Sequence, residues 1–226
     1  MKGWKLALAL AGVVLAAGIA AVLVWRTGPA PEGGPADAGG TALPAAVPYE
    51  FMWPEGAVRG TDVPGAILIP GTGQTLPLTW LGDVTSGPGE DKVAFLQRVR
   101  AEMVAYSDRQ TFEACAQICS DGNGAWSVRM TTVSAVAHCA VPPICMRGHG
   151  PIRQTIHSHC PSHTRLRATM ADQILSGGAM RHNRFFGRCD PDSFSRTDFE
   201  GWQPGWLAGV KALYRQEGPR RVTRFD

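Results

Sequence analysis

Residues 6–25 form a run of twenty residues without a charged side chain, and this run divides the chain into two parts. As a helix, twenty residues span about 30 Å, which is the thickness of the hydrocarbon layer of a membrane. Lys2 and Lys5 precede the run and favour a cytoplasmic N-terminus. We therefore expect residues 1–26 to anchor the chain in a membrane. The alternative is a cleavable signal segment, although its apolar region is usually shorter.

All six cysteines of the chain lie beyond this segment: Cys115, Cys119, Cys139, Cys145, Cys160 and Cys189. An even number of cysteines in an exported domain favours disulfides in an oxidising compartment. Six cysteines allow 15 pairings, so the sequence does not determine the connectivity. A second zinc cluster is the alternative, with Cys115 and Cys119, or Cys139 and Cys145, as ligand pairs, although neither pair has C-x-x-C spacing.

The exported part of the chain carries no net charge. The 22 basic residues outnumber the 19 acidic ones by three, and Lys2, Lys5 and Arg26 account for that excess. Nucleic-acid binding needs a basic surface, so we expect no nucleic-acid partner. Residues 27–47 are rich in Pro, Gly and Ala and predict a flexible linker, which leaves residues 48–226 as one domain with a core of its own.

Two histidines one residue apart, His157 and His159, follow Thr155 and Ile156, whose β-branched side chains favour a strand. Side chains alternate between the faces of a strand, so both imidazoles project to one side and can reach one metal ion. Asp198 supplies a third ligand, and three protein ligands leave the fourth position of zinc to water. Taken alone, the two histidines could instead be ordinary strand residues with satisfied hydrogen bonds.

Two further residues complete the candidate site. Glu113 lies in an expected strand over residues 111–119 and is a candidate general base. Ser195 is also typical of an N-cap of a short helix that starts at Arg196, with Asp198 as its third residue. That capping role is compatible with metal binding by Asp198.

The order of these residues resembles the motif of the JAMM (JAB/MPN) metallopeptidase family, over roughly residues 91–226. The motif is a glutamate, then H-x-H, then S-x-x-D, and all five positions are present: Glu113, His157, His159, Ser195 and Asp198. The Phe-Ser-x-x-Asp segment is closest to secreted bacterial members. The resemblance implies an α/β fold with a mixed sheet flanked by helices, preceded here by the N-terminal transmembrane helix.

The resemblance also implies a function for each motif residue. His157, His159 and Asp198 would hold Zn²⁺, Glu113 would act as the base, and Ser195 would stabilise the oxyanion. The reaction would be hydrolysis of a peptide or isopeptide bond in a protein or peptide substrate. The domain would lie in the periplasm, anchored in the bacterial inner membrane, or be secreted if the N-terminal segment is cleaved.

This chain departs from the family in one respect. The segment 160–194, which is 35 residues long, separates H-x-H from S-x-x-D, where the family has a short spacer, and Cys160 stands where the family usually has proline. Either the segment is an insertion folded over the site, or Ser195 and Asp198 match the motif by chance. A Cys160–Cys189 disulfide would close the insertion at its base, and we predict that bond.

The remaining elements follow from local patterns. Helical spacing of apolar residues predicts a helix over 91–106, and residues 125–134 alternate like the second strand of a hairpin. Residues 166–175 could form a helix inside the insertion, and 213–215 with 222–225 a closing hairpin. Short strands are expected between residues 48 and 83. Two other functions remain open: a non-catalytic envelope scaffold of the same fold, and a small disulfide-rich binding domain in which H-x-H is incidental.

Overall fold

The structure is a computed structural model that describes residues 46–161, 165–200, 204–218 and 221–226. All described residues belong to one compact unit. The predicted membrane segment 1–26 and the linker up to residue 45 lie outside the described residues. Within the described ranges, no helix combines the length and the apolar character that crossing a membrane requires.

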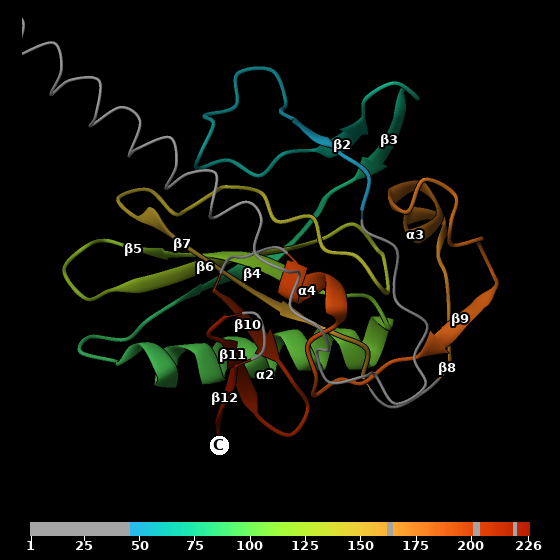
Figure 1. Ribbon diagram of the computed structural model, residues 1–226. Helices are drawn as coiled ribbons and strands as arrows, with labels where there is room; N and C mark the ends of the chain where they lie inside the picture. The colour runs from blue at the N-terminus through green and yellow to red at the C-terminus, as the bar shows by residue number, and fades with distance from the viewer. Residues whose placement is uncertain (1–45, 162–164, 201–203, 219–220) are drawn as a thin grey trace, which may run out of the picture. The chain divides into compact units, whose positions relative to one another are not determined.

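A seven-stranded mixed sheet forms the centre of the fold (Figure 1). Its order is β12-β11-β10-β7-β5-β6-β4, and every neighbouring pair is antiparallel except β7 and β10. The strands are β4 (Thr79–Thr85), β5 (Cys115–Ser120), β6 (Trp126–Thr132), β7 (Gly150–Ser158), β10 (Gly205–Ala208), β11 (Leu213–Gln216) and β12 (Val222–Phe225). The predicted mixed α/β architecture, the β5–β6 hairpin and the closing hairpin β11–β12 are confirmed.

One long helix, α2 (Lys92–Gln110), packs along this sheet (Figure 1). It begins where expected because the carboxylate of Asp91 accepts hydrogen bonds from the first-turn N–H groups of Val93 and Ala94. Its buried face carries Phe95, and the helix continues four residues beyond the predicted end at Tyr106. This helix is the main one beside the sheet, since the other two, α3 (Met170–Leu175) and α4 (Arg196–Glu200), have only six and five residues.

Glu113 lies outside a strand, contrary to the prediction. The helix ends at Thr111, whose left-handed backbone (φ 64°) turns the chain, and β5 begins only at Cys115. Glu113 therefore occupies the short connection, where its N–H donates to the carbonyl of Ala135.

A second, smaller sheet of three antiparallel strands, β1 (Glu50–Met52), β2 (Ala66–Ile69) and β3 (Gln74–Pro77), forms another layer. Its apolar side chains, such as Ile67 and Leu76, share a hydrophobic cluster with Leu175 of α3 (Met170–Leu175). Val47, at the end of the predicted linker, donates its N–H to the carbonyl of Leu175. The insertion and the N-terminal part of the domain therefore share one core.

The insertion itself contains β8 (Arg165–Arg167), α3 and β9 (Phe185–Arg188). The predicted helix over 166–175 is wrong in its first four residues, because Leu166 pairs with β9 and Thr169 caps the helix instead of entering it. Thr169 and Asp172 form a reciprocal capping box, which fixes the helix start at Met170.

Three disulfides join the six cysteines: Cys115–Cys139, Cys119–Cys145 and Cys160–Cys189. The predicted Cys160–Cys189 bond is confirmed, and its Cα atoms lie 6.1 Å apart at the base of the insertion. The alternative of a second zinc cluster is wrong, because each cysteine of the proposed ligand pairs is bonded to a cysteine of the other pair. Closing loops of this size stabilises a fold by ~3.5 kcal/mol each in the chain-entropy model. Three such bonds indicate an extracellular or periplasmic domain.

Asp172 joins the insertion to the segment that runs beside Glu113. It is fully buried, and its carboxylate accepts hydrogen bonds from the N–H groups of Val136 and Ala137 and contacts Nδ1 of His138 at 3.2 Å. Burial alone would raise the pKa of Asp172, but the hydrogen bonds from His138 and Thr169 outweigh it and hold the pKa below 3.8.

We expect Asp172→Asn to lower the free energy of unfolding by roughly 2–4 kcal/mol at neutral pH, because several buried donors lose an ionised acceptor. The pKa is depressed by folding, so this stabilisation is complete above the ordinary value of 3.8 and is lost as the pH falls through the folded value. Urea unfolding at several pH values measures the difference in unfolding free energy between the unsubstituted protein and the Asp172→Asn variant. The control Asp108→Asn, on an exposed helix position, should change stability by less than about 0.5 kcal/mol. If this difference in unfolding free energy did not become smaller at acidic pH, the result would contradict this account.

Candidate metal centre

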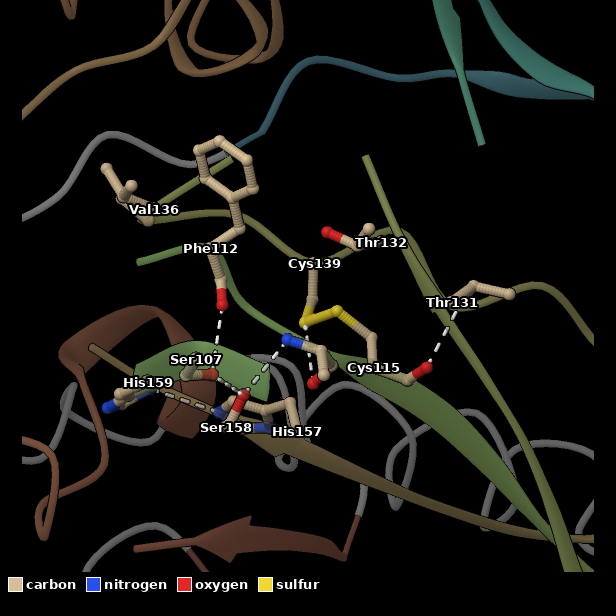
Figure 2. The surroundings of a disulfide bond; sticks show 12 residues. Ser107, Phe112, Cys115, Thr131, Thr132, Val136, Cys139, His157, Ser158 and His159 are labelled. Carbon is tan, nitrogen blue, oxygen red and sulfur yellow. Dashed lines mark hydrogen bonds between the residues drawn. A yellow bond between two sulfur atoms is a disulfide. The ribbon is translucent and has the colours of Figure 1, made fainter. Parts of the chain in front are cut away.

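The two histidines lie at the end of β7, in the middle of the seven-stranded sheet. His157 pairs with Cys115 of β5 and with Leu207 of β10, and His159 follows the last residue of the strand. Both side chains are largely buried, and their Nε2 atoms are 3.1 Å apart. Figure 2 shows the two rings side by side, joined by this contact. The prediction that both imidazoles reach one point is confirmed.

Asp198 approaches the same point from α4 (Arg196–Glu200), on the far side of the insertion. Its Oδ1 lies 3.3 Å from Nε2 of His157, and its Oδ2 lies 3.5 Å from Nε2 of His159. These three residues form a group whose ligand atoms all lie within 4.8 Å of one another, so they could hold a metal ion. The long segment between H-x-H and S-x-x-D is thus an insertion after which the chain returns to the histidines.

The three residues supply donor types that zinc binds, imidazole nitrogen and carboxylate oxygen. The Nε2 atoms of His157 and His159 are 3.1 Å apart, and each faces a different carboxylate oxygen of Asp198, at 3.3 Å and 3.5 Å. Three protein ligands would leave a fourth position of a zinc ion to water.

Ser195 holds the carboxylate of Asp198 in place. Its N–H and its hydroxyl donate to Oδ2 of Asp198 at 2.7 and 2.8 Å, and its Oγ accepts from the N–H of Asp198 at 3.3 Å. Ser195 therefore caps α4, as one interpretation of the sequence expected, and it orients a ligand carboxylate. Outer partners of this kind fix metal ligands in proteins.

Two other contacts orient the histidines. Nδ1 of His159 faces the carbonyl oxygen of Asp190 at 3.3 Å, so a proton on Nδ1 leaves the lone pair of Nε2 directed at the ligand group. The ring of Phe194 meets the ring of His157 edge to face, with centroids 6.1 Å apart. Both Asp190 and Phe194 belong to the C-terminal end of the insertion. The insertion therefore separates the ligands in the sequence and also contributes contacts that orient them.

Glu113 is buried beside this group. The charges of His159, His157 and Asp198 all act on its carboxyl group. The next residue, Ala114, is hydrogen-bonded to Ser158, which stands between the two histidines in the chain. Burial raises the pKa of Glu113, the two histidines lower it, and the net result is a raised pKa. A buried carboxyl group with a raised pKa can take up and release a proton.

The two carboxyl groups of the site favour a positive charge at or between the two imidazoles. Burial opposes the ionised form of Asp198, but His157 and His159 hold its pKa well below 3.8. In the metal-free chain, burial lowers the pKa of His159, yet Asp198 and Glu113 raise it to about 9. Two carboxyl groups therefore retain a proton on an imidazole, and a bound metal ion would take the place of that proton.

A buried hydroxyl network clamps the histidine strand to the segment that carries Glu113 (Figure 2). Oγ of Ser158 lies 2.7 Å from Oγ of Ser107 and accepts a hydrogen bond from the N–H of Ala114, while Ser107 donates to the carbonyl of Phe112. The network thus holds the residues on both sides of Glu113. The sequence analysis missed Ser107 and Ser158. The available signal was the position of Ser158, because the middle residue of H-x-H must face away from the metal.

Comparison with protein-family models, with curated proteins and with solved structures finds no match for this chain. The arrangement of the site therefore carries the functional argument by itself. The structure shows two histidines and one aspartate that could hold a metal ion, in a domain whose three disulfides indicate export.

We expect Ser158→Ala to lower the free energy of unfolding by roughly 1–3 kcal/mol, because the N–H of Ala114 and the hydroxyl of Ser107 lose a buried partner. The control is Ser127→Ala, since the hydroxyl of Ser127 is also fully buried but has no hydrogen-bond partner among the described residues. That variant should be neutral or slightly stabilising. Equal losses in both variants, measured by urea unfolding, would show that the clamp contributes nothing specific.

Proposed function

We propose that this protein is a zinc-dependent hydrolase of amide bonds, a peptidase or isopeptidase of the type that the JAMM resemblance implies. The observation that carries the proposal is a buried carboxyl group, Glu113, whose electrostatic environment is set by two histidines and one aspartate that could hold a metal ion. Three ligands and an open fourth position are typical of catalytic zinc sites, whereas structural sites usually have four protein ligands.

The choice of zinc rests on the donor types. Two imidazoles and one carboxylate are a known ligand set of catalytic zinc sites, with the fourth position left open. The same three donors also bind iron in some oxygenases, and the metal-content test below distinguishes the two metals.

Zinc bound by His157, His159 and Asp198 would supply a Lewis acid that polarises a scissile carbonyl and acidifies a water molecule. Glu113 would be the proton acceptor and would return the proton to the leaving amine, a role that its raised pKa favours. Ser195 orients Asp198, and its hydroxyl would be the donor available to the developing oxyanion. The surrounding burial excludes bulk water and strengthens each of these interactions.

The proposed setting is the periplasmic face of a bacterial inner membrane. Residues 1–26 would anchor the chain, or be cleaved to release it, and residues 27–47 would separate the domain from the membrane. The three disulfides support an oxidising compartment, and the 19 basic and 19 acidic residues beyond Arg26 leave the domain as a whole without the net positive charge typical of nucleic-acid binding. The proposed substrate is a protein or peptide.

The non-catalytic alternatives explain Glu113 less well. Burial of a carboxyl group is costly, and Glu113 is only 7% exposed. In a hydrolase, such a carboxyl group near the metal would serve as the proton acceptor. The burial of Glu113 therefore favours a hydrolase over a scaffold or a binding domain.

The first test is metal content. Residues 27–226, produced in an oxidising compartment and purified with zinc present, should contain about one zinc per chain, because the described residues hold one such group of three ligands. His157→Ala combined with His159→Ala should abolish binding, while the exposed control His182→Ala should retain it. Elemental analysis measures both. Unchanged zinc in the double variant, or iron in place of zinc, would end the proposal.

The second test separates the base from the ligands. Glu113→Gln should retain zinc but lower the rate of hydrolysis by at least roughly 10²–10⁴, because glutamine cannot accept a proton. The control Glu102→Gln, on the exposed face of α2, should leave the rate unchanged. A peptide library or an envelope proteome supplies the substrate. Loss of zinc would make Glu113 a ligand, and full activity would remove it from the mechanism.

A further inference from the structure

The insertion carries a concentration of positive charge that the proposed chemistry does not use. Between residues 165 and 188 the chain has five arginines and one acidic residue, Asp172. Asp172 is fully buried and is occupied by α3 and by the segment around His138. The charge of the domain as a whole is balanced, so this excess is a local property of the insertion.

Two of the arginines form an ordered pair on one face of β8. Arg165 and Arg167 are exposed, whereas Leu166 between them is buried, so both guanidinium groups project to the same side. The half-exposed ring of Phe185, in the paired strand β9, contacts both of them: its centroid lies 5.0 Å from Cζ of Arg165 and 4.3 Å from Cζ of Arg167. One aromatic ring thus holds two like charges close together.

The nearby turn adds more positive charge without neutralising it. Arg181 and Arg184 are exposed, and the N–H of Arg184 donates to the carbonyl of Arg181. The side chain of Arg167 donates to the carbonyl of Asn183, which ties the turn to β8. Within the described parts of the chain, none of the four exposed arginines forms a salt bridge. We call Arg165, Arg167, Arg181, Arg184 and Phe185 the arginine hairpin.

The arginine hairpin is connected directly to the candidate metal centre. The Cys160–Cys189 disulfide closes its base, and Cys160 follows the ligand His159 in the chain. On the other side, Asp190 follows Cys189 and its carbonyl oxygen faces Nδ1 of His159. The two chain segments that flank the hairpin therefore also carry or support the ligand His159.

We propose that the arginine hairpin is a docking site for an acidic, extended segment of the polypeptide substrate. Alternate side chains of an extended peptide are separated by ~6.7 Å, the same spacing that separates Arg165 from Arg167 along β8. Carboxylates at alternate positions of the peptide would then each meet one guanidinium group, whose planar donors suit a carboxylate. Because both arginines are already held by Phe185, less side-chain freedom is lost on binding.

An anionic membrane surface is the competing partner, and the hairpin fits it less well. Segments that bind at a membrane surface combine basic residues with several large apolar side chains that enter the lipid. Among the described side chains of residues 165–188, the exposed large apolar ones are Met170 and Phe185, and the ring of Phe185 is already in contact with both arginines. The chemistry of the site is thus that of carboxylate recognition.

The test measures binding without relying on catalysis. Residues 27–226 with Glu113→Gln are mixed with a fluorescein-labelled peptide of alternating Glu and Ser, and fluorescence anisotropy gives the Kd. Arg165→Gln combined with Arg167→Gln should weaken binding by about tenfold or more, because two charged pairs are lost. The matched control is Arg59→Gln combined with Arg147→Gln, two exposed arginines outside the insertion, which should leave the Kd unchanged. Binding should also weaken as salt is added.

Three results would overturn the proposal: no binding of the acidic peptide, equal losses in the two double variants, or binding of phosphatidylglycerol vesicles through the hairpin without binding of the peptide. Circular dichroism and peptide mapping of the Cys160–Cys189 bond verify that the variants are folded. The proposal rests on the proposed hydrolase function only for the identity of the bound molecule as substrate. If the peptide binds but the chain takes up no zinc, docking stands and the hydrolase proposal fails. If zinc binds but the peptide does not, the reverse holds.

Discussion

The structure around β7 depends on one constraint: two carboxyl groups and two imidazoles are buried together and must be neutralised. Asp198 lies within 3.5 Å of both imidazole Nε2 atoms, and the charge of Glu113 interacts with all three residues. In low dielectric surroundings, unpaired charges are very costly, so the group must hold either a proton or a metal cation. The hydrogen bonds from Ser195 and to Asp190 orient Asp198 and His159 in an arrangement that could hold a metal ion.

The fold meets this constraint with segments that are far apart in the sequence. The parallel pairing of β7 with β10, the clamp at Ser158 and the disulfide at Cys160 fix the histidine strand from three directions. The insertion returns the chain to within 3.5 Å of the point where it left, and it contributes supporting contacts on the way. An excursion of this length costs little entropy once its base is closed, because loop-closure entropy grows slowly with length. A large insertion is therefore compatible with an accurately positioned ligand.

Much of this could be predicted from the sequence, and the exceptions have physical reasons. The capped start of α2, the H-x-H strand and the disulfide at Cys160 follow from local patterns or from chain topology. Glu113 was placed in a strand because its neighbours are apolar, but the left-handed turn at Thr111 delays β5 to Cys115. The helix expected from residue 166 begins later because Leu166 pairs with a strand nineteen or more residues away, a long-range contact that no local pattern reveals. The pairing of the other four cysteines also depends on tertiary contacts and could not be predicted from local sequence.

The account depends most directly on what occupies the point between His157, His159 and Asp198. X-ray absorption spectroscopy at the zinc edge of the purified domain reports the atoms bound to the metal and their distances. The account predicts four light ligands, nitrogen and oxygen, at about 2.0–2.1 Å, with an imidazole signature and no sulfur. A spectrum with sulfur at about 2.3 Å would place zinc on cysteines instead. That result would contradict both the disulfide pairing and the proposed metal centre.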